Sequence, residues 1–195
     1  MRFLVQTLLV IAIALGLGSW SAAYVLDRFE SADTLVVGAW HADRTAGAPD
    51  ADPYSKARLA RSGHLGLGLG EGVAFQARTD SQGRELRREC TYRLEGAYPP
   101  ARIATLAAYD FGGRLIAPGE GRPDRLVSLD WMRQDDNSAI VQISSQAQPG
   151  NWLALVGDGG FVLAITFYDS PISTDSGAAP IAMPLIVRTG CLVDG

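Results

Sequence analysis

The residues with the best catalytic potential in this sequence are two Tyr-Asp pairs, Tyr109-Asp110 and Tyr168-Asp169. Each pair ends a run of β-type residues directly before a turn. Two carboxylates at strand ends can meet at one end of a β-sandwich and act as general acid and general base, as in a hydrolase or a carbohydrate-active enzyme. The alternative is that each Asp accepts hydrogen bonds inside its own turn, a common role for Asp, and we favour this structural interpretation.

Other signals for chemistry are absent from the sequence. His41 and His64 lie in no metal-ligand spacing, and no Gly-x-Ser-x-Gly nucleophile turn occurs. The glycine-rich stretch HLGLGLGEG (64–72) leads from a predicted helix into a predicted strand, whereas a phosphate-binding loop leads from a strand into a helix. The sequence therefore predicts no metal, no nucleotide and no cofactor, and it favours a non-catalytic role.

A ligand-binding surface, if the domain has one, is predicted around Tyr54, Arg58, Arg102 and Trp152. Arginine and aromatic side chains suit flat, polar ligands. The grouping is a hypothesis about proximity, and for Trp152 packing in a β-sandwich core is the favoured alternative.

Short β-type runs separated by Gly, Asp and Asn turns fill the chain from residue 34 onward. They span residues 34–40, 71–79, 90–96, 101–110, 139–145, 161–169 and 181–188, and a hairpin turn at 111–113 leads back into 114–117. A polar loop (41–51) and one short helix (52–62) follow the first run; Asp52 is placed to cap the helix and Pro53 to begin it. This pattern predicts a mainly β fold, an antiparallel β-sandwich or jelly-roll-like domain with one short helix.

The first 26 residues form a continuous apolar segment with no acidic residue and a single base, Arg2. As a helix from residue 3 to 26 it would rise about 36 Å, enough to cross a bilayer core of about 30 Å. We therefore predict a transmembrane anchor (1–26), a linker (27–33) and an extracytoplasmic domain (34–195), in a single-pass protein of the bacterial inner membrane with its C-terminal domain in the periplasm. A signal peptide cleaved near Ser21-Ala22-Ala23 is the alternative, and it also exports the rest of the chain.

Charge and cysteine content agree with an exported domain. The formal net charge is −4, which gives no electrostatic footprint for nucleic acid and no polybasic patch for anionic lipid. The two cysteines, Cys90 and Cys191, are predicted to form one disulfide in an oxidising compartment; two buried thiols that never meet are the alternative.

Several motifs in the exported part occur in a particular order and spacing. They are Gly38-x-Trp40, Asp52-Pro53-Tyr54-x-x-Ala57, Phe75-x-Ala77-x-Thr79-Asp80-x-x-Gly83-x-x-Leu86, Cys90-x-Tyr92-x-Leu94-x-Gly96-x-x-Pro99-x-Ala101-Arg102, Tyr109-Asp110, Asn151-Trp152, Phe167-Tyr168-Asp169 and Cys191. With these motifs the chain resembles the domain of unknown function 1214 family, here in a short, membrane-anchored form. The resemblance implies a β-rich fold, in a family whose biochemical function is not established.

The same resemblance suggests a partner. In longer relatives a domain resembling this one follows another domain, the domain of unknown function 1254, in a single chain. We therefore expect association with a separately encoded, similarly anchored protein of that type. The expected function is that of a binding or assembly module of the cell envelope; the alternative is an enzyme that uses Asp110 and Asp169.

Overall fold

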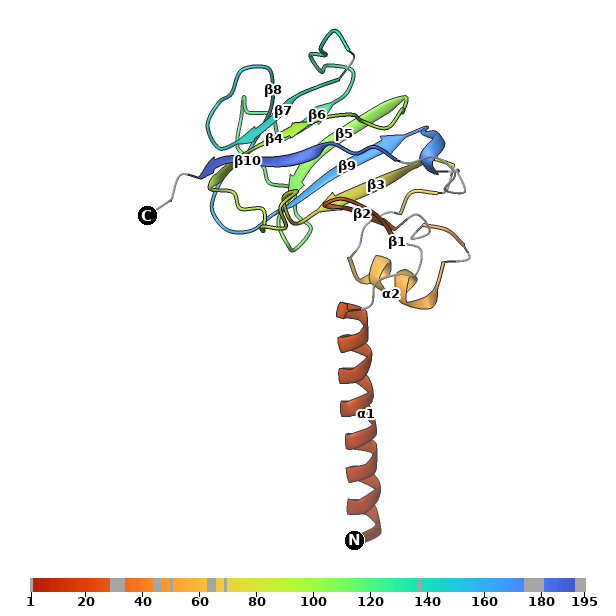
Figure 1. Cartoon of the computed structure of the whole chain (residues 1–195). Coiled ribbons are helices and arrows are strands. Elements are labelled where there is room, and N and C mark those ends of the chain that lie inside the picture. The colour runs from red at the N-terminus through yellow and green to blue at the C-terminus, as the bar shows by residue number, and fades with distance from the viewer. Residues whose placement is uncertain are drawn as a thin grey trace.

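The computed structural model describes residues 2–28, 34–43, 47–49, 51–62, 66–68, 70–136, 138–173 and 181–191. It contains an N-terminal helix, α1 (Arg2–Arg28), and a two-sheet β-domain. Figure 1 shows α1 extending away from the β-domain, with the N-terminus at its far end. The apolar helix predicted from the sequence is confirmed, and none of the 25-residue apolar stretch Arg2–Leu26 is buried by the rest of the protein.

The larger sheet has six strands in the order β1-β2-β3-β9-β5-β6, all antiparallel to their neighbours. Its strands are β1 (Thr34–Val37), β2 (Trp40–Asp43), β3 (Gly72–Ala77), β5 (Ile103–Tyr109), β6 (Arg125–Val127) and β9 (Val162–Tyr168). The smaller sheet has four strands in the order β10-β4-β7-β8. Its strands are β4 (Cys90–Glu95), β7 (Val141–Ser144), β8 (Asn151–Ala154) and β10 (Leu185–Cys191).

The core lies between the two sheets and takes alternate side chains from each. On β4 every second residue is buried, which is the pattern of a strand with one face on a core. Phe75 and Phe167 pack edge to face in the larger sheet, with ring centroids 6.1 Å apart. Tyr92 of the smaller sheet packs in the same way on Phe161, at 5.9 Å. Burial of each large apolar side chain contributes about 1.5–3 kcal/mol. The predicted mainly β class, with two sheets and one short helix, is confirmed.

The first hairpin corrects two predictions: residues 34–40 are not one strand, and residues 41–43 of the predicted loop 41–51 belong to a strand. The chain turns at Gly38-Ala39, so that β2 pairs back on β1. Gly38 has a φ of +60°, and a two-residue turn with positive φ at its first residue is typical of a type II′ hairpin. In β2, Trp40 and Ala42 are buried while His41 is exposed, so the polar residues of this segment are the outward half of an alternating strand.

The single longer helix of the β-domain, α2 (Pro53–Ser62), begins as predicted. The Oδ1 atom of Asp52 accepts hydrogen bonds from the main-chain N–H groups of Tyr54 and Ser55, at 2.9 and 3.0 Å. A short 3₁₀ helix, η1 (Pro171–Ser173), follows β9. Of the glycine-rich stretch that connects α2 to β3, residues 64, 65 and 69 lie outside the described residues.

Other strand assignments also differ from the prediction, and the predicted return strand at 114–117 is reduced to a single bridge between Tyr109 and Leu115. Neither β6 nor β8 was predicted, and β8 runs parallel to β7, whereas the other strand pairs in the described part of the chain are antiparallel. The last strand begins at Leu185 rather than 181, because Pro184 has no N–H to give to a ladder and its C=O accepts a hydrogen bond from the Trp40 indole at 2.8 Å.

Cys90 and Cys191 form a disulfide, as the sequence predicted. Cys90 begins β4 and Cys191 ends β10, and the two residues are direct cross-strand partners in the smaller sheet. The bond therefore fastens the edge strand β10 to the strand beside it.

Candidate functional site

The structure places Asp110 and Asp169 at opposite ends of the β5–β9 ladder. Tyr109, which precedes Asp110, pairs with Val162 at one end, and Tyr168, which precedes Asp169, pairs with Ile103 at the other. At about 3.4 Å per residue, the carboxylates are roughly 20 Å apart or more. Acid–base pairs in glycosidases are separated by about 5–5.5 Å or 6.5–9.5 Å. Asp110 and Asp169 therefore do not form an acid–base pair. Each follows the C-terminal end of its strand, and in antiparallel neighbours these ends lie at opposite ends of the ladder.

Asp110 instead stabilises its own turn. Its Oδ1 atom accepts the main-chain N–H of Arg114 at 2.9 Å, and its Oδ2 atom accepts the Arg114 Nε–H at 2.9 Å. The hydrogen bond from the Arg114 main chain and then the one from its side chain hold the pKa of Asp110 below its usual value, against a smaller opposing effect of desolvation. These contacts are the ones expected from the favoured interpretation, in which Asp110 accepts hydrogen bonds inside its own turn.

Asp169 and Arg102 come together at the other end of the ladder. Their side chains are both largely exposed, and Arg102 Nη1 lies 3.9 Å from Asp169 Oδ2. Asp169 has a φ of +49°, the only positive φ of a non-glycine residue in the described chain. The next residue, Ser170, is buried and donates a hydrogen bond from Oγ to the C=O of Pro100, at 2.6 Å. This corner thus holds the segment that leads into β5.

The other predicted ligand residues are not gathered at one surface. Tyr54 lies exposed on α2, and the side chain of Arg58 lies outside the described residues. Trp152 lies on β8, at the far side of the β-domain from α2 (Figure 1). Trp152 lines one hollow in the surface, and Arg102 directly follows Ala101, which lines another.

The larger hollow, which we call the Tyr98 cleft, has a volume of about 800 Å³. It opens at the end of the sandwich, between the end of β4 with the loop 96–101 on one side and the segments 128–136 and 138–140 on the other. Phe167 of β9 and Ala104 of β5, both buried, belong to its lining. Charged and amide side chains of Glu95, Arg133, Gln134 and Asp136 also line it. The lining of the cleft thus contains both apolar core residues and polar residues.

Two hydrogen-bond donors in the lining of this cleft have no partner among the described residues. They are the Tyr98 hydroxyl and the Trp131 indole N–H, and both atoms are buried. The two rings pack on each other with centroids 5.1 Å apart. Burial raises the pKa of Tyr98 further above neutral pH. A buried polar group without a partner costs about 1–3 kcal/mol, and such groups are rare in folded proteins.

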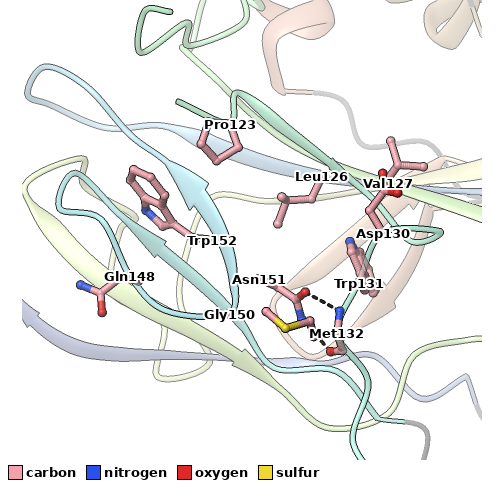
Figure 2. Close-up of a pocket in the computed structure, with 10 residues that line it drawn as sticks. All are labelled: Pro123, Leu126, Val127, Asp130, Trp131, Met132, Gln148, Gly150, Asn151 and Trp152. Atoms are coloured by element: carbon pink, nitrogen blue, oxygen red, sulfur yellow. Dashed lines mark hydrogen bonds between the residues drawn. The ribbon is translucent and has the colours of Figure 1, made fainter. Parts of the chain in front are cut away.

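A smaller pocket of about 240 Å³, which Trp131 also lines, lies between β6 and β8 (Figure 2). We call it the β6–β8 pocket. Asn151 fixes one end of it: its Oδ1 accepts the N–H of Met132 at 2.7 Å, and its Nδ2 donates to the C=O groups of Met132 and Ile140, both at 2.9 Å. Arg122 lies over the Trp152 ring at 5.6 Å, and the Trp152 indole donates to the C=O of Ser144 at 3.0 Å.

Sequence reasoning missed Tyr98 and Trp131 as a pair. The signal that could have found Tyr98 is the run AYPP (97–100) between two β-type segments, because two prolines in sequence prevent strand pairing and hold a loop at the strand end. No local signal could have brought Trp131 to it. Among the residues that the structure describes, no three His, Cys, Asp or Glu side chains are placed to hold a metal ion.

Comparison with protein families gives a match to one family, described as "Protein of unknown function (DUF1214)", over residues 71–172. This stretch runs from the residue before β3 to η1 and covers more than half of the chain. The chain belongs to the DUF1214 family. The matched region contains Trp131, Trp152 and Tyr98. The Tyr98 cleft and the β6–β8 pocket therefore lie wholly inside the DUF1214 part of the protein.

A solved structure shows that this fold occurs in another protein. The VPA0106 protein from Vibrio parahaemolyticus matches 94% of this chain with a TM-score of 0.61 and 19% identity, which establishes a shared fold. An uncharacterized protein from Burkholderia cenocepacia matches 91% of the chain at 16% identity, with a TM-score of 0.42. The DUF1214 chain spans 45% of the first protein and 51% of the second. A search of curated protein sequences gave no relative.

Proposed function

We propose that this DUF1214 protein is a membrane-anchored, extracytoplasmic binding module that takes a ligand in the Tyr98 cleft. The observation that carries the proposal is the pair of buried donors, Tyr98 Oη and Trp131 Nε1, in a cleft of about 800 Å³. The volume falls in the range of about 300–1,000 Å³ that is typical of small-molecule sites. Both donors are buried in the free protein and unsatisfied among the described residues, so a ligand that supplies acceptor oxygens would reach them after a shift of the lining side chains.

Anchoring and location are part of the same proposal. None of the apolar stretch Arg2–Leu26 is buried by the rest of the protein, so this helix needs a bilayer unless it is removed as a signal peptide. The Cys90–Cys191 disulfide supports an oxidising compartment such as the periplasm. With the N-terminus inside, the β-domain lies on the periplasmic face of the inner membrane.

Reporter fusions test the topology. An alkaline phosphatase that folds only after export, joined after Gly195, is expected to be active, whereas a β-galactosidase joined at the same residue is expected to be inactive. The opposite result would exclude export of the β-domain. Release of a chain that begins at Tyr24 without detergent would replace the anchor with a cleaved signal peptide.

A ligand-observed NMR screen of a fragment library against the full chain in detergent micelles tests the cleft. Ala101 lines the cleft and Ala74 is an exposed residue of β3 that does not, so Ala101→Trp blocks the site and Ala74→Trp is the matched control. We expect fragments rich in acceptor oxygens to bind the wild type and the Ala74→Trp variant and to lose binding in Ala101→Trp. No bound fragment, or equal binding to both variants, would exclude the cleft as the ligand site.

We also propose a protein partner, a separately encoded domain of unknown function 1254 anchored in the same membrane. The DUF1214 chain spans less than half of the VPA0106 protein, so a domain of this fold exists within a longer chain. Two anchors in one membrane raise the local concentration of both domains, so that a weak interface is sufficient for association. Gentle detergent extraction followed by crosslinking and mass spectrometry is expected to recover the pair at native expression; recovery of monomer alone would contradict association.

A further inference from the structure

We infer that the β6–β8 pocket is a second binding site, which takes one flat aromatic ring carrying a hydrogen-bonding N–H or O–H group. The site shares Trp131 and no other lining residue with the Tyr98 cleft, and it does not depend on a ligand in that cleft.

The pocket lies between the edge strands of the two sheets, which are hydrogen-bonded at its two ends and separated between them. β6 is the last strand of the larger sheet and β8 is the last strand of the smaller sheet. They are joined at one end by the hydrogen bond from the Ala154 N–H to the Pro123 C=O, at 2.9 Å. At the other end the Asn151 side chain holds Met132 across the gap. The pocket is the space between these two hydrogen-bonded contacts, and its lining residues are shown in Figure 2.

Main-chain groups of both strands face this opening. The N–H of Ala154 points away from β7, toward Pro123, and groups two residues apart on a strand point to the same side. The N–H and C=O of Trp152 therefore lie on the edge that faces β6. By the same alternation the N–H of Val127 faces outward, because the next residue, Ser128, donates its N–H to β5. An occupant thus meets donors and an acceptor at the edges of the pocket.

The remaining lining is apolar and aromatic. Trp131 and Trp152 lie on two sides of the pocket, with Leu126 between them and Met132 at its lower margin (Figure 2). Rings pack favourably on Trp faces, and a Met sulfur makes favourable contacts with aromatic rings. Met132 is largely exposed, so its side chain can close over an occupant without unfolding the loop that carries it.

The volume limits the size of the occupant. An apolar cavity of about 150 Å³ is large enough for benzene, and drug-sized ligands need about 300 Å³ or more. A pocket of about 240 Å³ therefore fits a single ring system such as indole or phenol. The ring can come from a free small molecule or from a Trp or Tyr side chain of a polypeptide, and the two sources differ in whether a peptide main chain must fit outside the pocket.

The test uses the full chain in detergent micelles with ¹⁵N-labelled indole groups and three probes: indole, p-cresol and N-acetyl-tryptophanamide. Binding in the pocket is expected to shift the indole N–H resonances of Trp131 and Trp152. The resonance of Trp40, which is buried and bonded to Pro184, should not move. Trp20 on α1 is exposed in the protein and reports probe that dissolves in the detergent.

Two variants decide the location. Val127 lines the pocket and Leu129 is an exposed residue two positions away that does not, so Val127→Trp fills the site and Leu129→Trp is the control. We expect at least a tenfold weaker apparent affinity in the first and an unchanged affinity in the second. Binding of N-acetyl-tryptophanamide as tight as that of indole assigns the site to a polypeptide side chain, and binding of indole or p-cresol alone assigns it to a free ring. Shifts confined to Trp20, or equal affinity in both variants, would overturn the inference.

Discussion

Asp80 and Asp110 make the same hydrogen bonds in two turns, one after β3 and one after β5; the Asp80 side chain is buried and that of Asp110 is partly exposed. Each accepts the main-chain N–H of the residue four positions later at Oδ1, at 2.9 Å. Each also accepts the Nε–H of that same residue at Oδ2, where Arg84 is 2.8 Å from Asp80 and Arg114 is 2.9 Å from Asp110. Both turns have the sequence D-x-x-G-R. Asp110, a candidate catalytic residue in the sequence, therefore has the same turn-stabilising role as Asp80.

Substitution of the two aspartates by Asn is expected to separate their contributions. Asp80 is fully buried and also lies 3.6 Å from Arg188 Nε, whereas Arg114 is largely exposed to solvent. Because a hydrogen bond to a charged group is worth about 1.5–3 kcal/mol when water is excluded, Asp80→Asn should lower the free energy of unfolding by that amount. Asp110→Asn should cost clearly less. Urea denaturation of both variants measures the difference; an equal loss would contradict it.

The stability conferred by Asp80 should depend on pH. Burial alone would raise the pKa of Asp80, but hydrogen bonds from Arg84 and Gln82 hold it below its usual value. A carboxylate with a depressed pKa in the folded state stabilises the protein above the pKa of the unfolded chain, about 3.9, and this stability disappears as pH falls through the folded-state value. The difference in unfolding free energy between wild type and Asp80→Asn should therefore be constant from pH 5 to 7 and shrink below about pH 4. A difference that grows toward low pH would refute the assignment.

Much of the fold could be predicted from the sequence because its signals are local. The cap at Asp52, the alternation in β4 and the turn at 80–84 each depend on residues within one element. The parallel pairing of β7 and β8 could not be predicted, because it depends on which two segments pair and not on the residue pattern within either segment. The relative position of Asp110 and Asp169 could not be predicted for the same reason. The two Tyr-Asp pairs are similar in sequence, but in the antiparallel β5–β9 ladder the two aspartates lie at opposite ends.

Loss of the disulfide should be one of the largest single losses of stability in the β-domain. Cys90 and Cys191 are 101 residues apart, and closing a loop of about 100 residues restrains the unfolded chain by up to about 4.7 kcal/mol in the entropy model. We expect reductant to lower the denaturation midpoint of the wild type to that of the double variant Cys90→Ser, Cys191→Ser. The double variant itself should not respond to reductant. Alkylation of both thiols in the native exported protein would show instead that the bond does not form.

Asn151 should hold the loop that shapes both pockets. Its side chain makes three hydrogen bonds to main-chain groups of Met132 and Ile140. Asn151→Ala removes all three, and at about 1 kcal/mol for each bond, less the hydration that exposed groups regain, a loss of about 2 kcal/mol is expected. Amide hydrogen exchange of residues 131–133 should become faster. Gln148→Ala, which changes a neighbouring residue in the lining of the β6–β8 pocket, is the control, and equal exchange in the two variants would exclude this role of Asn151.

Two tyrosines should respond to the same substitution with opposite sign. The Tyr92 hydroxyl accepts the main-chain N–H of Arg87 at 2.7 Å, so Tyr92→Phe leaves a donor without its partner and should lower the free energy of unfolding by about 1–3 kcal/mol. The buried Tyr98 hydroxyl has no partner among the described residues. Tyr98→Phe removes this desolvated group without creating a large cavity, so stability should rise by about 1 kcal/mol. Thermal denaturation of both variants, side by side, gives the two signs.

The same Tyr98→Phe variant connects stability with binding. A residue that lowers the stability of the free protein is expected at a functional site, where its cost is offset only when the ligand is bound. Fragments that bind the Tyr98 cleft through an acceptor oxygen should therefore bind Tyr98→Phe more weakly, although this variant is more stable than the wild type. Fragment affinities and denaturation midpoints measured on one preparation test the pairing of the two effects. A variant that is more stable and binds the fragments as tightly as the wild type would show that the hydroxyl plays no part in ligand recognition.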